Sequence, residues 1–339
     1  MNKNTLKFGF VTDVHATALT PAGRSDNFRE AIMLKLEECG QIWKDYDVQE
    51  VWWGGDLYDG PEVSKSVMND VTTRILDWKK PVVGVIGSHD YTGYQIKTLK
   101  RSALGLIVLP NIIELVGKVP SSEQDAIKVY TFPDSAKSLV LTGVSHSHDL
   151  IDNPKKFVPD YLQEFDREKT FIVQIIHADL VEKPVPWPHM LLENLHTPAH
   201  LVLSGHIHSG WKEPITFQKE NTFPTVYFNP GSLARQENTG KVRRPRVCII
   251  EIDSEFNIDI KSVYLQSAKE HPFHEKITED REAMSARDIT NVLKTFENKD
   301  LKIVDIKRDL PLIAKELEYS DAVVERVFGF LDKVQNVKG

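Results

Sequence analysis

Short apolar runs alternate with amphipathic segments from the N-terminus to about residue 235. Apolar residues at steps of three and four predict one helix that begins after Ser25 and Asp26 and another that includes residues 67–78. Runs rich in β-branched and aromatic residues predict strands at residues 6–11, 50–53, 82–86, 127–132, 139–144, 171–176, 201–203 and 225–228. The alternation of strands with helices predicts a layered α/β or α+β domain.

The pattern changes after the last of these strands. Residues 246–252 and 258–265 predict two antiparallel strands, and we expect this hairpin to complete a second sheet. Beyond His274 the chain is charged and mostly helical in its periodicity. We therefore expect a main domain over residues 1–270 and a small C-terminal α/β cap or helical region over residues 271–339.

The composition narrows the class of protein. The 339 residues are 41% hydrophobic and 27% charged, which excludes a fibrous or disordered chain. The net charge is −7, so any affinity for a polyanion has to come from local basic clusters or bound cations. Cys39 and Cys248 are too few for a disulfide framework or a cysteine-based metal site. No apolar run is long enough for a signal peptide or a membrane span, which predicts a cytoplasmic protein without a membrane partner.

Metal-ligating side chains follow five of the predicted strands. They are Asp13 and His15 after the first strand, Asp56 and Asp59 after the second, Ser88, His89 and Asp90 after the third, His177 after residues 171–176, and His206 and His208 after residues 201–203. Ligands of α/β sheets gather at the carboxyl ends of the strands, where glycines let the backbone turn sharply. We therefore expect these side chains to converge.

Imidazole and carboxylate groups in one cluster suit a divalent cation such as Mn²⁺, Fe²⁺ or Zn²⁺. Two such ions bridged by a carboxylate can hold a hydroxide and neutralise both the attacking and the leaving oxygen of a phosphoryl displacement. The pattern therefore predicts hydrolysis of a phosphate ester. Unrelated structural histidines are the alternative, which the repeated placement at strand ends disfavours.

These motifs resemble those of a known superfamily. Asp13-x-His15, Gly55-Asp56-x-x-Asp59, Gly87-Ser88-His89-Asp90, His177 and Gly205-His206-x-His208 are similar to the signature of the calcineurin-like metallophosphoesterases. Within that superfamily, Gly55-Asp56-Leu57-Tyr58-Asp59, the helix after the first motif and Asn229-Pro230-Gly231-Ser232-Leu233 most resemble the SbcD-type DNA repair nucleases. The resemblance covers residues 6 to about 265. It implies a four-layer α-β-β-α sandwich as the catalytic domain.

The resemblance also implies a role for each site residue. One metal would be held by Asp13, His15, Asp56 and His208, and a second by Asp56, Ser88, His177 and His206. His89 would be the acid that protonates the leaving oxygen, Asp90 would orient its ring, and Asp59 would support the ligands from outside. The implied cofactors are two divalent ions, Mn²⁺ above all and otherwise Mg²⁺, Fe²⁺ or Zn²⁺.

Ser88 departs from the superfamily, which has Asn at this position. A hydroxyl has a shorter reach than an amide carbonyl and is a weaker oxygen donor. The departure predicts that the second metal is bound more weakly or through a water. An impaired or specialised site is the alternative.

Two further residues border the expected cleft. His146 follows the strand at residues 139–144 and is predicted either to contact the substrate or to lie exposed on a loop. Arg235 lies close to the basic residues of segment 241–246. Guanidinium groups there would suit phosphate oxygens, although a basic run between strands is more often a solvated turn.

The first hypothesis for function is a divalent-metal-dependent DNA exonuclease or endonuclease in repair or recombination. The resemblance implies a homodimer that works with an SbcC-like coiled-coil ATPase, and residues 271–339 would place DNA or contact that partner. A stand-alone phosphodiesterase or phosphatase acting on small phosphate esters is the second hypothesis. A degenerate scaffold without activity, suggested by Ser88, is the third.

Overall fold

The computed structural model describes residues 4–92, 96–118, 125–218, 223–236, 243–268 and 272–273. Apart from Pro272 and Phe273, the C-terminal region expected over residues 271–339 lies outside these residues. The division of the chain at residue 270 therefore stays a prediction.

The first of two sheets has six strands in the order β14-β13-β1-β2-β3-β4. Their bounds are Thr5–Val11 (β1), Glu50–Trp53 (β2), Val82–Gly84 (β3), Glu114–Leu115 (β4), Arg246–Asp253 (β13) and Ile258–Tyr264 (β14). β1 to β4 are parallel, whereas β13 pairs antiparallel with β1. The hairpin thus extends the first sheet, and our assignment of it to a second sheet was wrong. It pairs there because Cys248 and Ile250 continue the buried inner face formed by Phe8 and Phe10.

The second sheet also has six strands, in the order β11-β12-β10-β7-β6-β5. Their bounds are Lys128–Thr131 (β5), Ser138–Val144 (β6), Thr170–His177 (β7), Leu201–Gly205 (β10), Ile215–Phe217 (β11) and Thr225–Phe228 (β12). β6, β7, β10 and β12 are parallel, and β5 and β11 are antiparallel edges. A separate short pair is formed by Leu180–Val181 (β8) and Met190–Leu191 (β9).

The two helices that the sequence predicts, Phe28–Asp45 (α1) and Lys65–Asp77 (α2), have the expected apolar stripes. The sequence analysis did not predict the short α-helix Gly105–Val108 (α3) or the 3₁₀ helices Ile96–Arg101 (η1), Pro154–Phe157 (η2), Asp160–Glu164 (η3) and Leu192–Asn194 (η4). Asn27 caps α1 by accepting a hydrogen bond from the backbone N–H of Glu30, so the helix starts slightly later than expected.

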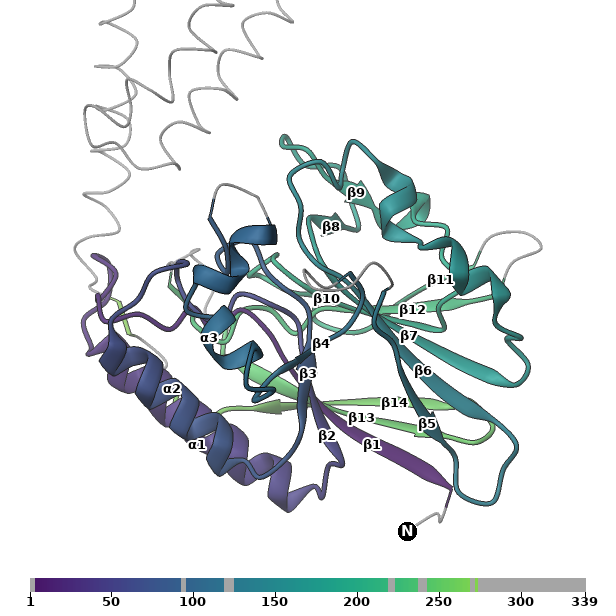
Figure 1. The fold of residues 1–339 in the computed structure, drawn as a ribbon, viewed down its shortest axis with the longest axis horizontal. Coiled ribbons are helices and arrows are strands. Elements are labelled where there is room, and N and C mark those ends of the chain that lie inside the picture. The colour runs from purple at the N-terminus through teal and green to yellow at the C-terminus, as the bar shows by residue number, and fades with distance from the viewer. Residues whose placement is uncertain are drawn as a thin grey trace, which may run out of the picture. The chain divides into compact units, whose positions relative to one another are not determined.

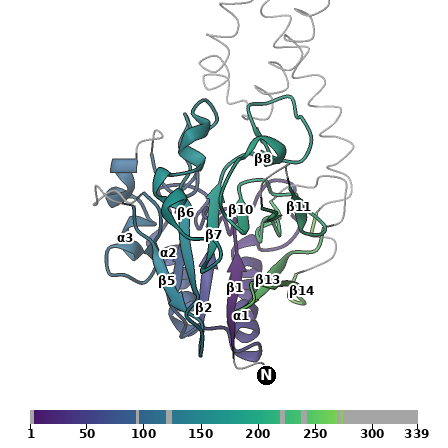
Figure 2. The ribbon, with the colours of Figure 1, turned by 90° about the vertical axis from the view of Figure 1, so that its right-hand side faces the viewer.

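The two sheets pack face to face around an apolar core (Figure 1) that includes Phe8, Trp52 and Leu203. α1 and α2 cover the outer face of the first sheet (Figure 2), and their buried residues pack on it. The outer face of the second sheet is covered by η2, η3 and η4 with their loops. The α/β sandwich is confirmed, although the fourth layer consists of 3₁₀ helices in the described residues.

The topology brings the carboxyl ends of parallel strands from both sheets to one place (Figure 1). β1 and β2 end in register, with Val11 opposite Trp53. β7 and β10 also end in register, with His177 opposite Gly205. Within the described part of the chain, no helix combines the length and apolarity needed to cross a membrane.

Candidate metal centre

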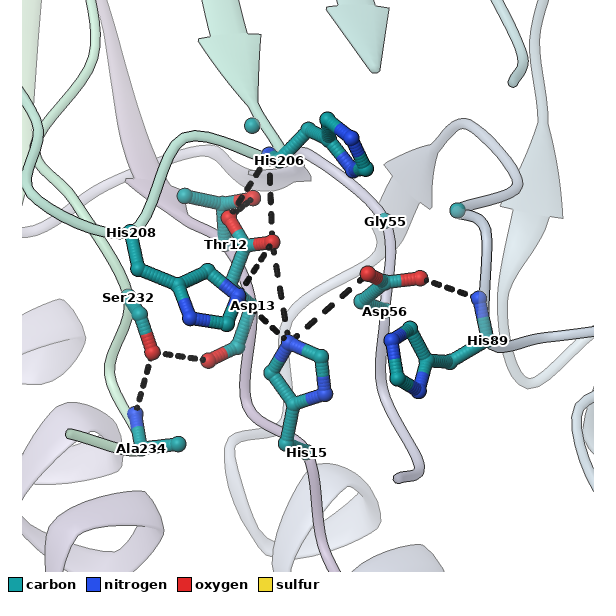
Figure 3. A network of polar contacts seen from close by, with 12 residues as sticks. Thr12, Asp13, His15, Gly55, Asp56, His89, His206, His208, Ser232 and Ala234 are labelled. Atoms are coloured by element: carbon teal, nitrogen blue, oxygen red, sulfur yellow. Dashed lines mark hydrogen bonds and ion pairs between the residues drawn. The ribbon is translucent and has the colours of Figure 1, made fainter. Parts of the chain in front are cut away.

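The loops after β1 and β10 bring together a first cluster of ligands (Figure 3). One ligand atom from each of Asp13, His15 and His208 lies within 4.8 Å of the other two. Nε2 of His15 is 3.0 Å from Nε2 of His208 and 3.8 Å from Oδ1 of Asp13. Asp13 and His15 are fully buried, whereas the His208 side chain is 40% exposed. Solvent therefore reaches the cluster from the side of His208.

A second cluster combines Asp56, His177 and His206. Nε2 of His177 lies 3.2 Å from Oδ2 of Asp56 and 3.2 Å from Nδ1 of His206. The same Asp56 oxygen is 3.7 Å from Nε2 of His15. Asp56 therefore lies between the two clusters, which is the position that a bridging carboxylate needs.

Four of these ligands have left-handed backbone conformations. The φ angles are 53° at Asp13, 45° at His15, 52° at Asp56 and 80° at His206. Such a conformation costs a non-glycine residue on the order of 1–3 kcal/mol, so the surroundings must impose it. Backbone hydrogen bonds do so: the N–H of Asp13 donates to the carbonyl of Gly55 (3.1 Å), and that of His15 donates to Asp56 (3.0 Å).

Hydrogen bonds outside the clusters fix which nitrogen of each ring faces inward. Nδ1–H of His177 donates to the carbonyl oxygen of Gly54 (2.6 Å), so Nε2 presents its lone pair to Asp56. Nε2 of His206 lies 3.1 Å from Oδ2 of Asp179, so Nδ1 faces inward. Our sequence analysis missed Asp179. It follows His177 by two positions, the same spacing that relates Asp13 to His15, and this was the available signal.

The donor set fits a divalent cation. When His177 and His206 are neutral, their lone pairs and the carboxylate of Asp56 face one another, and such atoms repel unless a positive charge lies between them. Burial alone would lower the pKa of His177, but Asp56 raises it to about 9. Burial likewise opposes the high pKa of His15, which Asp13 and Asp59 raise to about 10. The centre therefore favours positive charge, and its nitrogen and oxygen donors suit Mn²⁺, Fe²⁺ or Zn²⁺.

Ser88 reaches the second cluster despite its short side chain. Its Oγ donates to Oδ2 of Asp56 (3.1 Å) and lies 3.4 Å from Nδ1 of His206. The hydroxyl is thus beside the atoms that the superfamily resemblance assigns to the second metal.

His89 lies at the open side of the centre, where its side chain is exposed. Its backbone N–H donates to Oδ1 of Asp56 (2.8 Å), and its ring is 4.7 Å from the ring of His15. Nδ1–H of His89 donates to the backbone carbonyl of Asp59 (2.8 Å). Oδ1 of Asp59 is 3.4 Å from Nδ1 of His15 and accepts a hydrogen bond from Gln236 (2.6 Å), and the supporting role of Asp59 stays a prediction.

Asp90 has a different role from the one expected. It does not orient the His89 ring, which the Asp59 carbonyl holds instead. The buried carboxylate of Asp90 accepts hydrogen bonds from the backbone N–H groups of Gly87 (2.7 Å) and Asp56 (3.0 Å). Asp90 therefore joins the loop after β2 to the loop after β3. The tight turn that leads to Asp90 directs its side chain to these backbone N–H groups.

Lysine and arginine side chains hold the segment Asn229–Arg235 against the first cluster. The carbonyl oxygens of this segment accept hydrogen bonds from Lys35, Arg24, Arg243 and Arg246. The Ser232 hydroxyl donates to the carbonyl of Asp13 (3.0 Å), as Figure 3 shows. Arg243 and Arg246 are therefore occupied inside the protein instead of forming a solvated turn or an open phosphate site.

The two predicted substrate contacts lie in different segments. Arg235 is 9% exposed and is the last residue of the segment Asn229–Arg235, whose Ser232 contacts Asp13. His146 is half-buried beside the second cluster, where burial and the nearby His177 and His206 lower its pKa to about 3. The contact of either residue with substrate stays a prediction.

Comparison with solved structures finds similar chains at low sequence identity. A candidate 5′-nucleotidase from Staphylococcus aureus in complex with α-ketoglutarate aligns at 14% identity and a TM-score of 0.48 over 83% of this chain; the chain spans 58% of that protein. A dimetal phosphatase from Danio rerio aligns at 12% identity and a TM-score of 0.50 over 76% of this chain and 96% of its own. The calcineurin-like phosphoesterase YfkN from Bacillus subtilis aligns at 12% identity and a TM-score of 0.46 over 76% of this chain and 91% of its own.

Comparison by sequence identifies the family. No protein of curated function matches the chain. The family model of the calcineurin-like phosphoesterases, however, matches residues 6–210, which is more than half of the chain and includes every predicted metal ligand. Members of this family use a dinuclear metal site, and the two clusters joined by Asp56 have the corresponding arrangement. The chain therefore belongs to the calcineurin-like phosphoesterases and is a metal-dependent phosphoesterase.

Proposed function

We propose that this protein is a DNA nuclease that hydrolyses phosphodiester bonds in repair or recombination. The position of Asp56 between the two clusters, with His89 exposed beside it, is the observation that carries the hydrolytic part of this proposal. The assignment to DNA is supported by the resemblance of two segments, Gly55–Asp59 and Asn229–Leu233, to the SbcD-type nucleases.

The residues of the centre have distinct tasks in such a reaction. When bound, two divalent ions would neutralise the charge on the phosphate and make an attacking water more acidic. Asp13, His15, Asp56 and His208 would hold one ion, and Asp56, Ser88, His177 and His206 the other. His89 would deliver a proton from Nε2 to the leaving oxygen, because its Nδ1–H is used in the hydrogen bond to the Asp59 carbonyl and Nε2 is the nitrogen left for proton transfer.

The exposure of the centre supports a polymeric substrate. His89 is exposed, and the His208 side chain is 40% exposed. Trp187, 47% exposed, donates from Nε1 to Asp179 (2.9 Å) and so lies near the ligand His206. An exposed indole next to a phosphate site offers a face on which a base can stack. A strand could therefore pass across the centre without being enclosed.

The proposal extends to ions, partners and location. We infer that Mn²⁺ is the preferred ion because the donors are mixed nitrogen and oxygen. We also infer that the protein acts in the cytoplasm as a homodimer with an SbcC-like ATPase, to which residues 271–339 would contribute. A phosphodiesterase or phosphatase acting on small esters is the alternative, and the similarity to a protein described as a dimetal phosphatase is what favours it.

The deciding experiment compares DNA with small esters. With Mn²⁺, the wild type is expected to degrade linear duplex DNA and to leave mononucleotides and aryl phosphates largely intact. His89→Ala should lose between 10²- and 10⁴-fold in rate while its metal content, measured by mass spectrometry, stays the same. His148→Ala, an exposed histidine two residues from His146, is the control.

Other outcomes separate the alternatives. Turnover of small esters without DNA cleavage would replace the nuclease by the phosphatase hypothesis. A wild type that hydrolyses neither substrate, and that stays inactive after Ser88→Asn, would be a degenerate scaffold.

A further inference from the structure

A cavity of about 350 Å³ lies on the outer face of the second sheet. It is bounded by η3 and the segment that follows it, by η4 and the segment that follows it, and by β11 and β12. None of the described residues that line the cavity belongs to the metal centre. The volume is within the range of about 300–1,000 Å³ that is usual for small-molecule sites. The cavity is therefore a candidate ligand site of its own.

The wall of this cavity is mostly apolar. The apolar and aromatic side chains that line it are Leu192, Leu195, Pro198, Phe217, Phe223 and Tyr227. Hydroxyl groups in the wall are used inside the protein. The hydroxyl of Tyr227 donates to the carbonyl of Leu195 (3.1 Å), and the hydroxyl of Thr225 donates to a backbone carbonyl at 2.8 Å. These two hydroxyl protons are therefore not available to a ligand.

Arg167 brings an unpaired positive charge to the cavity. It lines the wall, and its Nε and Nη2 are buried without a hydrogen-bond partner. Burial lowers the pKa of Arg167, and no carboxylate among the described residues offsets this effect. The adjacent Asp166 forms an ion pair with Lys169 instead (3.2 Å). A guanidinium group removed from water without a partner costs free energy, which an anion in the cavity would recover.

The two unpartnered nitrogens define which anion fits. Nε and Nη2 form one edge of the guanidinium group, and two parallel N–H donors of this kind bind both oxygens of a carboxylate. The Phe223 ring lies over the guanidinium group, with its centroid 4.5 Å from Cζ of Arg167. Because Phe223 is 58% exposed, few contacts oppose a movement of its ring that opens this edge to a ligand.

We propose that this cavity binds a small organic anion in which an aromatic body carries a carboxylate, and that Arg167 holds the carboxylate through Nε and Nη2. The apolar wall disfavours a fully hydrated ion such as inorganic phosphate, because it replaces none of the hydrogen bonds that the ion has in water. A neutral aromatic molecule would leave Arg167 unpaired. The proposed site is separate from the metal centre and does not depend on whether the substrate is DNA.

Titration calorimetry of the full-length, Mn²⁺-loaded protein with two matched probes tests this. The wild type is expected to bind 1-naphthoate at least tenfold more tightly than 1-naphthylmethanol, which has the same rings and no charge. Arg167→Met should bind both probes with equal affinity. Lys155→Met, which removes an exposed cation outside the cavity, is the control and should keep the tenfold preference. Treatment with a chelator should leave the affinity for 1-naphthoate unchanged.

The stability of Arg167→Met gives a second readout. If Arg167 serves a ligand, its removal without ligand should leave the urea midpoint equal to that of the wild type or higher, because an unpaired buried charge is lost. A lower midpoint would indicate a structural role and count against the proposal. Failure of the wild type to bind 1-naphthoate, equal affinity of the wild type for the two probes, or undiminished binding of 1-naphthoate by Arg167→Met would overturn it. Binding that disappears with the chelator would place the carboxylate at the metal centre and equally overturn it.

Discussion

Nε2 of His15 and Nε2 of His208 lie 3.0 Å apart although 193 positions separate the two residues in the sequence. His15 follows β1 of the first sheet, and His208 follows β10 of the second. Burial and the neighbouring His15 lower the pKa of His208 to about 4, despite the nearby Asp13, whereas carboxylates raise the pKa of His15. A protonated His15 can therefore donate from Nε2 to the neutral Nε2 of His208, a contact that joins the two sheets at the site and that a bound divalent ion would replace.

Removal of divalent ions is expected to destabilise the fold. An ion bound only by the native state at a hundredfold excess over its Kd adds about 2.7 kcal/mol to the free energy of unfolding. Calorimetry should therefore show a lower thermal midpoint after treatment with a chelator and recovery when Mn²⁺ is added. The variant Asp56→Asn, which weakens both clusters, should show less of this recovery. Equal midpoints for the stripped and reloaded wild type would contradict the expectation.

Gly87 leaves room for Asp56. A Cβ atom at Gly87 would lie 2.1 Å from Oδ1 and 2.3 Å from the backbone nitrogen of Asp56, so Gly87→Ala must displace the bridging carboxylate. We expect a loss of about 1–3 kcal/mol in the free energy of unfolding, as for other overpacked sites, and weaker binding of both ions. Urea denaturation and metal analysis measure the two effects. Gly60→Ala, where a Cβ would meet nothing within 4 Å, is the control, and equal behaviour of the two variants would refute the steric explanation.

The sequence predicts most of the strands because they are apolar runs, whereas β4, β8, β9 and β11, each of two or three residues, were not predicted. β2 and β12 have the predicted bounds, and β1 and β7 extend the predictions by one or two residues. The pairing partner of the β13–β14 hairpin was not predictable in this way. Alternation shows that one face of a strand is buried, but not which sheet buries it.

The candidate site was likewise predictable from the sequence only in part. The ligands were predictable from their places after strands, as for Asp13 and His206. The left-handed backbone of Asp56 was not, because Asp carries no sequence signal that distinguishes this conformation from a common turn. The role of Asp90 was misassigned because proximity in sequence to His89 suggested a side-chain contact, whereas the turn directs the carboxylate to backbone N–H groups.

Asp179 supports a metal ligand from outside the cluster. Its Oδ2 lies 3.1 Å from Nε2 of His206, and Trp187 holds its other oxygen (2.9 Å). Asp179→Asn is therefore expected to weaken the second ion by about 10- to 100-fold, as is typical when such a partner is changed. Titration calorimetry measures this, with the exposed Asp152→Asn as control. Trp187→Phe should have a smaller effect, and an affinity in Asp179→Asn equal to that of Asp152→Asn would rule out the supporting role.

Lys35 joins α1 to the segment that holds the first cluster. Its buried Nζ donates to the carbonyl oxygens of Leu233 (2.7 Å) and Ala234 (3.1 Å). Burial, together with the nearby Arg24 and Arg243, lowers the pKa of Lys35 to about 7. The neutral amine can still donate to the carbonyl oxygens, so the contact persists when the proton is lost.

This lowered pKa predicts how stability depends on pH. An unfolded lysine titrates near 10.4, so between about pH 7 and pH 10 the unfolded chain binds one more proton than the native protein at this residue. The contribution of Lys35 to the free energy of unfolding therefore rises with pH, by about 1.4 kcal/mol per pH unit within that window. Lys35→Met should remove this rise, whereas Lys44→Met, an exposed lysine on the same helix, should keep it. Urea denaturation of the Mn²⁺-loaded proteins at two pH values inside the window measures the difference. Parallel pH profiles for the wild type and Lys35→Met would show that Lys35 remains charged in its buried position.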